Sequence, residues 1–210
     1  MAINVEKFVL GPLETNTYLV SETESGVCAV VDPAIEDERL LNALENKNVQ
    51  FIFLTHGHFD HISGAKSVKE KTNAKVVIHE EDEECLNSET KSLYYLHYSG
   101  LMPKVSADVL TVDNMTVRFG NETVKVLHTP GHTKGGTCYI FEDSRIIFSG
   151  DTLFNMSAGR TDFPGGSARE ELMSLSKLAK LDGDYKVYCG HGPDTTLEFE
   201  RKNNRYVKIR

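Results

Sequence analysis

The sequence has 210 residues, of which 40% are hydrophobic and 26% are charged, so an intrinsically disordered chain is not expected. This length supports one full hydrophobic core, and we expect a single domain over residues 1–210. The net charge of −8 argues against a nucleic-acid partner, because binding to phosphates depends on clustered lysines and arginines.

The start of the sequence and its cysteines predict where the protein resides. Residues 1–20 lack a basic segment followed by a long apolar run, so we expect no signal peptide, and no stretch is long enough to suggest a membrane partner. The four cysteines lie far apart and form no C-x-x-C pair, which favours free thiols in a cytoplasmic protein. They are Cys28, Cys85, Cys138 and Cys189.

The first part of the chain alternates short apolar strands with helices. An uninterrupted apolar run at 51–54 is typical of a strand buried on both faces, as in a sheet that helices cover. Three leucines recur at helical spacing within 36–48 and predict a helix there, and 65–73 is predicted as a second helix. The predicted strands of this part are 3–9, 17–21, 27–31, 51–54 and 75–79.

Residues 80–107 have a less regular pattern. The acidic stretch 80–86 is predicted as a short helix, and the aromatic stretch 92–103 is expected to form a loop over a pocket. The tyrosines of this loop either line that pocket or, as aromatic residues more often do, pack against the core. They are Tyr94, Tyr95 and Tyr98.

From residue 109 onward short strands dominate. Turn residues at 120–121 and 142–144 separate neighbouring strands and predict hairpins. Capping-box signatures at 167–170 and 195–198 predict the starts of two further helices. The strands predicted here are 109–112, 115–119, 122–128, 137–141, 145–149 and 185–190.

Histidines and aspartates follow the ends of several predicted strands. The strand at 51–54 leads into the segment HGHFDH, and three later strands each lead to one more histidine or aspartate. Side chains two positions apart in an extended segment point the same way, so His56 and His58 can bind one ion together. The residues gathered in this way are His56, His58, Asp60, His61, His132, Asp151 and His191.

We expect these seven side chains to converge, because α/β proteins place their sites at the carboxyl ends of strands. Catalytic zinc usually takes three protein ligands plus water, so seven candidate ligands predict two bound ions. A single histidine without this context is more often an ordinary core or surface residue. His79, His97 and His128 are interpreted in that way.

Four segments around these residues resemble the metallo-β-lactamase superfamily. They are THGHFDH at 55–61, HTPGHTKGG at 128–136, FSGDTLF at 148–154 and CGHGPDTT at 189–196. Within that superfamily, HTPGHT at 128–133 together with GRTDFPGG at 159–166 is most similar to short bacterial hydrolases related to glyoxalase II. The resemblance covers nearly the whole chain. It implies an α/β fold, a four-layer αβ/βα sandwich with a binuclear metal site at one edge of its sheets.

The resemblance also implies a role for each candidate ligand. His56, His58 and His132 would hold the first ion, Asp60, His61 and His191 would hold the second, and Asp151 would bridge them. The ions would be divalent, with zinc favoured and iron or manganese as alternatives.

The implied reaction is metal-dependent hydrolysis of a small-molecule thioester, such as an S-acyl thiol conjugate. Two ions that share a water lower its pKa from about 15.7 toward about 7, and the hydroxide attacks the carbonyl carbon. The thiolate, whose conjugate acid has a pKa of about 8.5, leaves without a general acid. Asp60 would also orient the hydroxide. Arg160 would either bind a substrate carboxylate or pair with Asp162.

This sequence differs in two ways from related families, and the differences bear on the expected substrate. β-Lactamases of this fold generally carry a cysteine at the position of Asp151 and are exported. Larger glyoxalase II enzymes add a C-terminal helical domain that contacts glutathione, whereas only 19 residues follow His191 here. The acyl group and the thiol carrier are therefore left open, as is the oligomeric state.

Three other functions are compatible with the same residues. A persulfide dioxygenase would use a single iron held by His56, His132 and Asp151, a set that leaves open positions for oxygen. A lactone or phosphodiester hydrolase, including a nuclease, would use the same binuclear centre. A non-enzymatic metal-binding module would bind ions without turnover.

Overall fold

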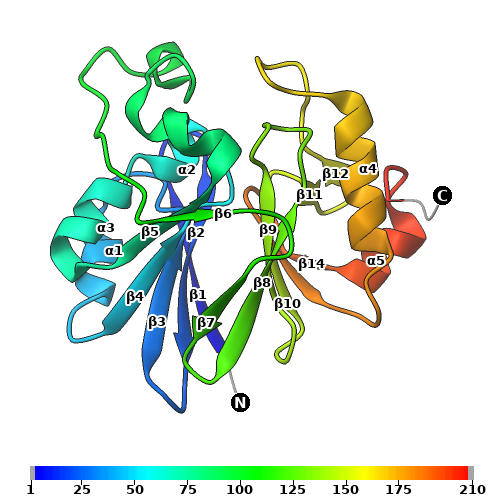
Figure 1. Ribbon diagram of the computed structural model, residues 1–210, viewed down its shortest axis with the longest axis horizontal. Coiled ribbons are helices and arrows are strands. Elements are labelled where there is room, and N and C mark those ends of the chain that lie inside the picture. Colours follow the sequence, from blue (N-terminus) through cyan, green and yellow to red (C-terminus); the bar gives the residue numbers. More distant parts are fainter. Residues whose placement is uncertain (1–2, 208–210) are drawn as a thin grey trace.

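The computed structural model describes residues 3–207 and has two central sheets that pack face to face. Helices cover the outer face of each sheet, so the order of layers is helix, sheet, sheet, helix (Figure 1). This arrangement confirms the predicted four-layer αβ/βα sandwich. The predicted domain boundaries at residues 1 and 210 lie outside the described residues.

The first sheet has six strands in chain order, and these are β1 (Ile3–Leu10), β2 (Thr15–Glu22), β3 (Val27–Val31), β4 (Asn48–Phe53), β5 (Lys75–His79) and β6 (Val109–Thr111). The β1, β2 and β3 strands pair antiparallel, and β3 to β6 pair parallel. Parallel neighbours need crossover connections. These contain α1 (Glu38–Ala43), α2 (Phe59–Ile62), α3 (Ala65–Thr72) and the 3₁₀ helices η1 (Glu80–Asn87) and η2 (Tyr94–Leu96).

The second sheet also has six strands, in the order β14 (Thr195–Thr196), β13 (Lys186–Cys189), β10 (Ile146–Gly150), β9 (Thr137–Phe141), β8 (Glu122–His128) and β7 (Thr116–Phe119). Only β10 and β13 pair parallel. The crossover between them contains a ribbon of β11 (Leu153–Phe154) and β12 (Ser157–Ala158) and then α4 (Ala168–Ala179), and α5 (Leu197–Asn203) follows β14.

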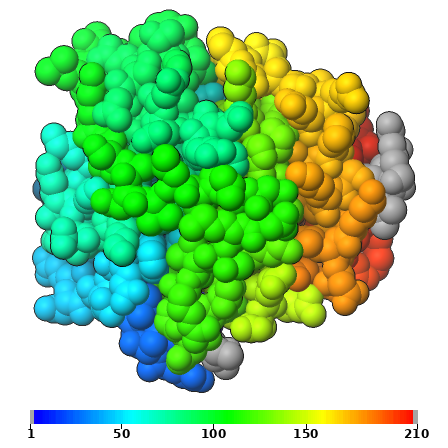
Figure 2. Space-filling view, viewed as in Figure 1, coloured from blue at the N-terminus to red at the C-terminus, as the bar shows by residue number. Residues whose placement is uncertain are grey.

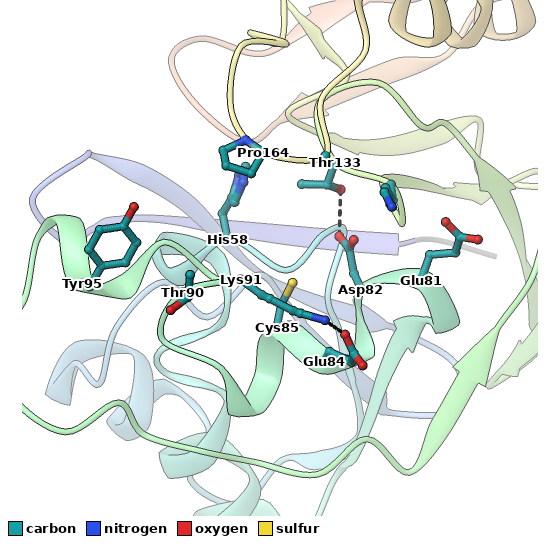
Figure 3. A pocket seen from close by; sticks show the side chains of 12 residues that line it. His58, Glu81, Asp82, Glu84, Cys85, Thr90, Lys91, Tyr95, Thr133 and Pro164 are labelled. Carbon is teal, nitrogen blue, oxygen red and sulfur yellow. Dashed lines mark hydrogen bonds and ion pairs between the residues drawn. The ribbon is translucent and has the colours of Figure 1, made fainter.

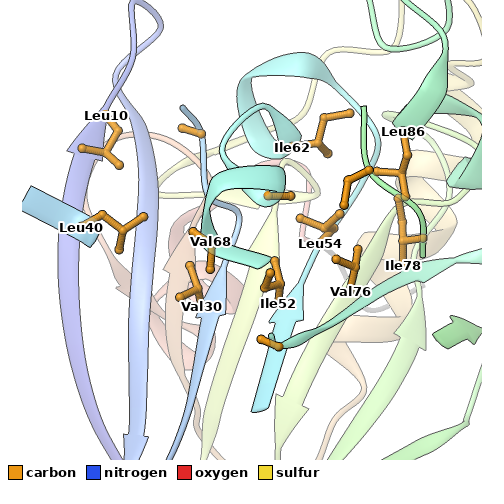
Figure 4. Packing of buried hydrophobic residues seen from close by; sticks show 14 of the residues in the cluster. Leu10, Val30, Leu40, Ile52, Leu54, Ile62, Val68, Val76, Ile78 and Leu86 are labelled. Carbon is orange, nitrogen blue, oxygen red and sulfur yellow. The ribbon is translucent and has the colours of Figure 1, made fainter. Parts of the chain in front are cut away.

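Three apolar clusters fill the interfaces between the four layers. Ile52 packs with Val68 between the first sheet and its helices (Figure 4). The next residue, Phe53, points to the opposite face and contacts Tyr139 between the sheets, with ring centroids 4.8 Å apart. The third cluster lies between the second sheet and α4 and α5. The predicted strand at 51–54 is apolar throughout because each face of β4 meets a different core.

Capping side chains fix the starts of two helices, and one cap differs from its prediction. Ser167 Oγ accepts the backbone N–H of Glu170 at the start of α4, as predicted. At the start of α5 the cap is Thr196, whose hydroxyl oxygen accepts a backbone N–H of the first turn. Thr195 instead donates its hydroxyl to Glu200. The predicted cap of the last helix is therefore wrong by one residue.

The described residues also bear on the cysteines and on membranes. All four cysteines are buried and unpaired, which confirms the prediction of free thiols. Within residues 3–207, no helix combines the length and the apolar character that crossing a bilayer requires.

Candidate metal centre

Loops that follow four strands carry the seven predicted ligands to one edge of the sheets. The loop after β4 and helix α2 supply His56, His58, Asp60 and His61, and the loops after β8, β10 and β13 supply His132, Asp151 and His191. The structure brings all seven together. Five of them are buried, whereas Asp151 and His191 are partly exposed.

The ligand atoms form three overlapping groups, and within each group they lie within 4.8 Å of one another. The groups are His56, His58 and His132; Asp60, His61 and His191; and His56, His61 and Asp151. The first two have the same members as the two ligand sets that the resemblance implies. Asp151 Oδ2 lies 3.5 Å from Nε2 of both His132 and His191. Asp151 Oδ1 lies 3.4 Å from His61 Nε2, so this carboxylate occupies the position of a bridge.

Unpaired buried atoms indicate that the cluster fits metal ions. Among the described residues, His56 Nε2, His61 Nε2 and Asp151 Oδ1 are buried and have no hydrogen-bond partner. A buried polar atom without a partner costs about 1–3 kcal/mol, so several in one cluster call for a ligand that compensates them. Imidazole nitrogens and carboxylate oxygens are donors that zinc, iron and manganese accept. The donor set therefore suits these ions.

The pKa values of the histidines agree with this role. Burial and the neighbouring imidazoles lower the pKa of His56 well below its usual value and that of His58 to about 3, so both rings are neutral at pH 7. Burial alone would also lower the pKa of His61, but the carboxylates of Asp60 and Asp151 outweigh it and raise the pKa to about 10. In the metal-free chain, His61 thus holds a proton that metal binding would release.

Backbone carbonyls orient two of the rings from outside the cluster. The carbonyl oxygen of Arg160 lies 2.7 Å from His132 Nδ1, and that of Leu13 lies 3.1 Å from His191 Nδ1. Each carbonyl oxygen accepts a hydrogen bond from the Nδ1–H group, so Nε2 of each ring faces the cluster.

Asp32 orients a third ring and was not predicted from the sequence. Its Oδ2 lies 2.9 Å from His61 Nδ1 and accepts the Thr55 hydroxyl at 2.6 Å, while Oδ1 accepts the Thr55 backbone N–H at 2.8 Å. The pair Asp32 and Pro33 was interpreted as a turn that closes a strand. An aspartate directly after an apolar strand is the pattern that identified Asp151, and it was the available signal here too.

The cluster opens into a cavity of about 560 Å³, which we call the main cavity. Its walls are largely apolar and include Phe59, Leu93, Phe154 and Phe163. Such a cavity can hold a small organic group above the seven side chains.

Arg160 also lines the main cavity, and its side chain is already paired. Its Nε and Nη2 each lie 2.7 Å from an oxygen of Asp162, and the guanidinium lies 4.0 Å from the ring centroid of Phe163. Of the two interpretations of Arg160, the structure shows the pair with Asp162.

A second cavity of about 310 Å³ adjoins the centre and shares only His58 with the main cavity (Figure 3). It lies between the segment of η1 and η2, teal and green in Figure 2, and the yellow segment that leads into α4. Tyr95 lines this second cavity. Tyr94 is buried in the apolar cluster between the first sheet and its helices, and Tyr98 packs against that cluster. The expected loop over a pocket is thus present, with one tyrosine of three lining a cavity.

The remaining histidines lie outside the three ligand groups. His79 and His128 stack on each other with ring centroids 4.0 Å apart, and His97 stacks on Phe59 at 4.8 Å. This placement agrees with the interpretation of His79 and His128 as ordinary residues, whereas His97 also lines the main cavity.

The chain matches the metallo-β-lactamase superfamily over residues 10–191 and belongs to it. This superfamily consists in general of metal-dependent hydrolases, and the histidine and aspartate cluster is typical of it. One relative of this chain is the hydroxyacylglutathione hydrolase GloC of Haemophilus influenzae, which is 29% identical to it over 98% of both chains.

Two solved structures show the same fold. The crystal structure of the BLEG-1 B3 metallo-β-lactamase has a TM-score of 0.91 and 31% identity, and it covers 97% of this chain and 99% of that one. The crystal structure of TTHA1623 in a di-iron-bound form has a TM-score of 0.85 and 32% identity, with coverage of 96% and 100%.

Proposed function

We propose that the protein hydrolyses the thioester of a small S-acyl thiol with two divalent ions, zinc being favoured and iron or manganese the alternatives. The observation that carries the proposal is the pair of three-residue ligand groups joined at Asp151. The similarity to GloC, which is named a hydroxyacylglutathione hydrolase, supports a thioester as the substrate.

The ions, when bound, supply a water whose pKa falls toward about 7 and a positive charge that polarises a carbonyl oxygen. The chain holds and orients the reacting groups. Asp60 Oδ2 lies 3.1 Å from Thr15 Oγ1 and 3.3 Å from His191 Nε2, at the wall of the main cavity. Burial would raise the pKa of Asp60, but His61 and His191 hold it below its usual value, so the carboxylate is ionised at pH 7. It can accept a hydrogen bond from the attacking water and so orient it.

The two cavities give the proposed substrate separate spaces. The main cavity, with its apolar walls, suits the acyl group. If Arg160 released Asp162, its guanidinium could bind a carboxylate on that acyl group. The second cavity is lined by polar and charged side chains, among them Lys134 and the ion pair of Lys91 with Glu84, and it suits the thiol carrier. Both spaces reach His58, beside which the thioester would lie.

A persulfide dioxygenase with a single iron is the main competing function. Its ligands would be His56, His132 and Asp151, which the structure also brings together. One ion there would leave the buried Nε2 of His61 without a hydrogen bond of ordinary geometry, with only the carboxylates of Asp60 and Asp151 beside it at 3.4 to 3.5 Å. Two ions satisfy that atom as well, and this favours the binuclear hydrolase.

A substrate panel on metal-loaded protein tests the proposal. The panel contains S-acyl thioesters of several thiols, a lactone, a β-lactam, a phosphodiester and a persulfide with an oxygen electrode. We expect thioester cleavage that a chelator abolishes and that added Zn²⁺ restores. Cleavage that survives removal of the metal, or persulfide-dependent oxygen uptake without thioester cleavage, would exclude the proposed function.

A further inference from the structure

Helix η1 lies between the two loops that carry His58 and His132, and one of its side chains binds both loops. Asp82 Oδ2 accepts the hydroxyl of Thr133 at 2.7 Å (Figure 3). The same oxygen accepts the backbone N–H of Gly57 at 2.9 Å. Asp82 Oδ1 accepts the backbone N–H of Gly135 at 2.8 Å. Gly57 separates His56 from His58 in the sequence, and Thr133 follows His132.

The packing around Asp82 leaves no room for a side chain at the two loop glycines. A Cβ on Gly57 would lie 2.4 Å from Cys85 Cβ, and a Cβ on Gly135 would lie 2.7 Å from Asp82 Cβ. A 3₁₀ helix has three residues per turn, so Asp82 and Cys85 project from the same face of η1. Each ligand loop therefore has a glycine at the point where η1 presses against it.

The carboxylate of Asp82 is buried, with 3% of the residue exposed. A buried carboxylate is stable only while donors surround it, so the three hydrogen bonds hold each other in place. Asp82 thus fixes the distance between the backbones of the two loops.

His58 depends on this backbone contact more than the other ligands do. The carbonyl oxygen of Arg160 holds the ring of His132 from outside the cluster, and Asp32 holds that of His61. In the described part of the chain, the only hydrogen bond of the His58 ring is with His132, Nδ1 to Nε2 at 2.9 Å. The position of His58 is therefore set by its main chain, which Asp82 holds on one side at Gly57 and which α2 holds on the other, where the His58 carbonyl accepts the His61 N–H at 3.0 Å.

We propose that Asp82 is a positioning residue, which sets the separation of His58 from His132 and thereby the affinity of the centre for the ion held by His56, His58 and His132. The inference rests on the metal centre of the proposed function but not on the bond that is cleaved. It also gives residues 80–87, whose role the sequence left open, a part in building the site.

Metal binding to the full chain tests this inference without any measurement of activity. The variants are Asp82→Asn, which loses one acceptor, and Thr133→Val, which loses a single hydrogen bond. Asp108→Asn is the matched control, because Asp108 also ties two segments through the Val76 N–H at 2.8 Å and Lys69 but lies away from the centre. Stripped protein is titrated with Co²⁺ against a chelator, and apo melting temperatures are recorded in parallel.

We expect Asp82→Asn to weaken one of the two binding steps by tenfold or more, as partners outside the ligand sphere commonly do, and to leave the other within threefold. The weakened step should be the one that His58→Ala abolishes. Thr133→Val should weaken the same step by a smaller factor. Asp108→Asn should lower the melting temperature and change neither step.

Wild-type affinity for both ions in Asp82→Asn, or in Thr133→Val should Asp82→Asn not fold, would overturn the inference. So would an equal loss of affinity in Asp108→Asn, because that result would reflect general destabilisation. A wild-type chain that binds no ion would refute the metal centre itself, which is a different outcome from a variant that binds as the wild type does.

Discussion

Asp151 is the residue on which both ligand groups depend, since its two oxygens lie 3.4 to 3.5 Å from His61, His132 and His191. We expect Asp151→Ala to lose both ions together, and thioester hydrolysis to fall at least about 100-fold, because the shared negative charge is removed from a buried site. Elemental analysis after dialysis measures the change. Asp162→Asn, an exposed carboxylate near the cavity, is the control and should keep both ions. Retention of one ion by Asp151→Ala would show that the sites are independent.

Glu171 is a buried acid in α4 that the proposed reaction does not use. It is 4% exposed, and neither carboxyl oxygen has a hydrogen-bond partner of ordinary geometry. Burial raises the pKa of Glu171 from 4.5 to about 8, and the backbone N–H groups of His132 and Gly159 offset only part of this. At neutral pH the carboxyl is therefore largely protonated in the folded chain and ionised in the unfolded one.

This raised pKa predicts a pH-dependent stability. The contribution of Glu171 is fully favourable below pH 4.5 and is lost as the pH rises through about 8, because unfolding releases the proton. Glu171→Gln cannot ionise, so in metal-free protein we expect it to be more stable than the wild type by about 1–3 kcal/mol at pH 8.5, and equal to it near pH 4.5. Urea unfolding at both pH values measures the difference. The exposed neighbour Glu170→Gln should show no such gain, because its charge in the first turn of α4 favours the helix. A gain for Glu171→Gln that is the same at both pH values would contradict the shift.

The sequence predicted the ligand cluster because each member breaks an apolar pattern at the end of a strand. Asp32 was missed because an aspartate before a proline also closes strands without any further role. Asp82 lies in an acidic run, where no single carboxylate stands out from neighbours that face solvent. Glu171 belongs to an ordinary amphipathic helix, and its burial depends on how α4 packs against the loop of His132.

At the scale of elements, the N-cap of α4 carries a prediction of its own. Ser167 accepts the Glu170 N–H, while its own N–H donates to the Gly131 carbonyl at 2.7 Å in the loop before His132. We expect Ser167→Ala to lower the free energy of unfolding by about 1 kcal/mol, because one N–H of the first turn loses its acceptor. Chemical denaturation measures this loss. Ser167→Asp keeps an acceptor and should unfold like the wild type, and an equal loss in both variants would exclude the cap as the cause.

Strands and long helices could be predicted from local pattern, and the shortest elements could not. The strand at 51–54 was predicted from its apolar run, and residues 51–53 form the end of β4. Helix α2 spans only Phe59–Ile62, and the β11–β12 ribbon has two residues in each strand. Segments of this length show no periodicity, so tertiary contacts alone determine them. The cap at Thr196 was missed because two neighbouring threonines offer the same side chain.

At the scale of the whole molecule, the centre exists because the two sheets meet at one edge. Thr15, at the start of β2, forms an isolated antiparallel β-bridge with the backbone of His191. The Asn16 N–H donates to the Gly190 carbonyl at 2.7 Å. These contacts join the first sheet to the end of the second. The four layers followed from the family resemblance, but such pairings between distant parts of the chain have no local signal in one sequence.

The number of divalent ions bound per chain tests the account most directly. The protein is stripped with a chelator, reloaded separately with Zn²⁺, Mn²⁺ or anaerobic Fe²⁺, dialysed and measured by elemental analysis against protein concentration. The account predicts two ions per chain, both lost in Asp151→Ala. A single ion at saturation with every metal, retained when His61 or His191 is replaced by alanine, would contradict it.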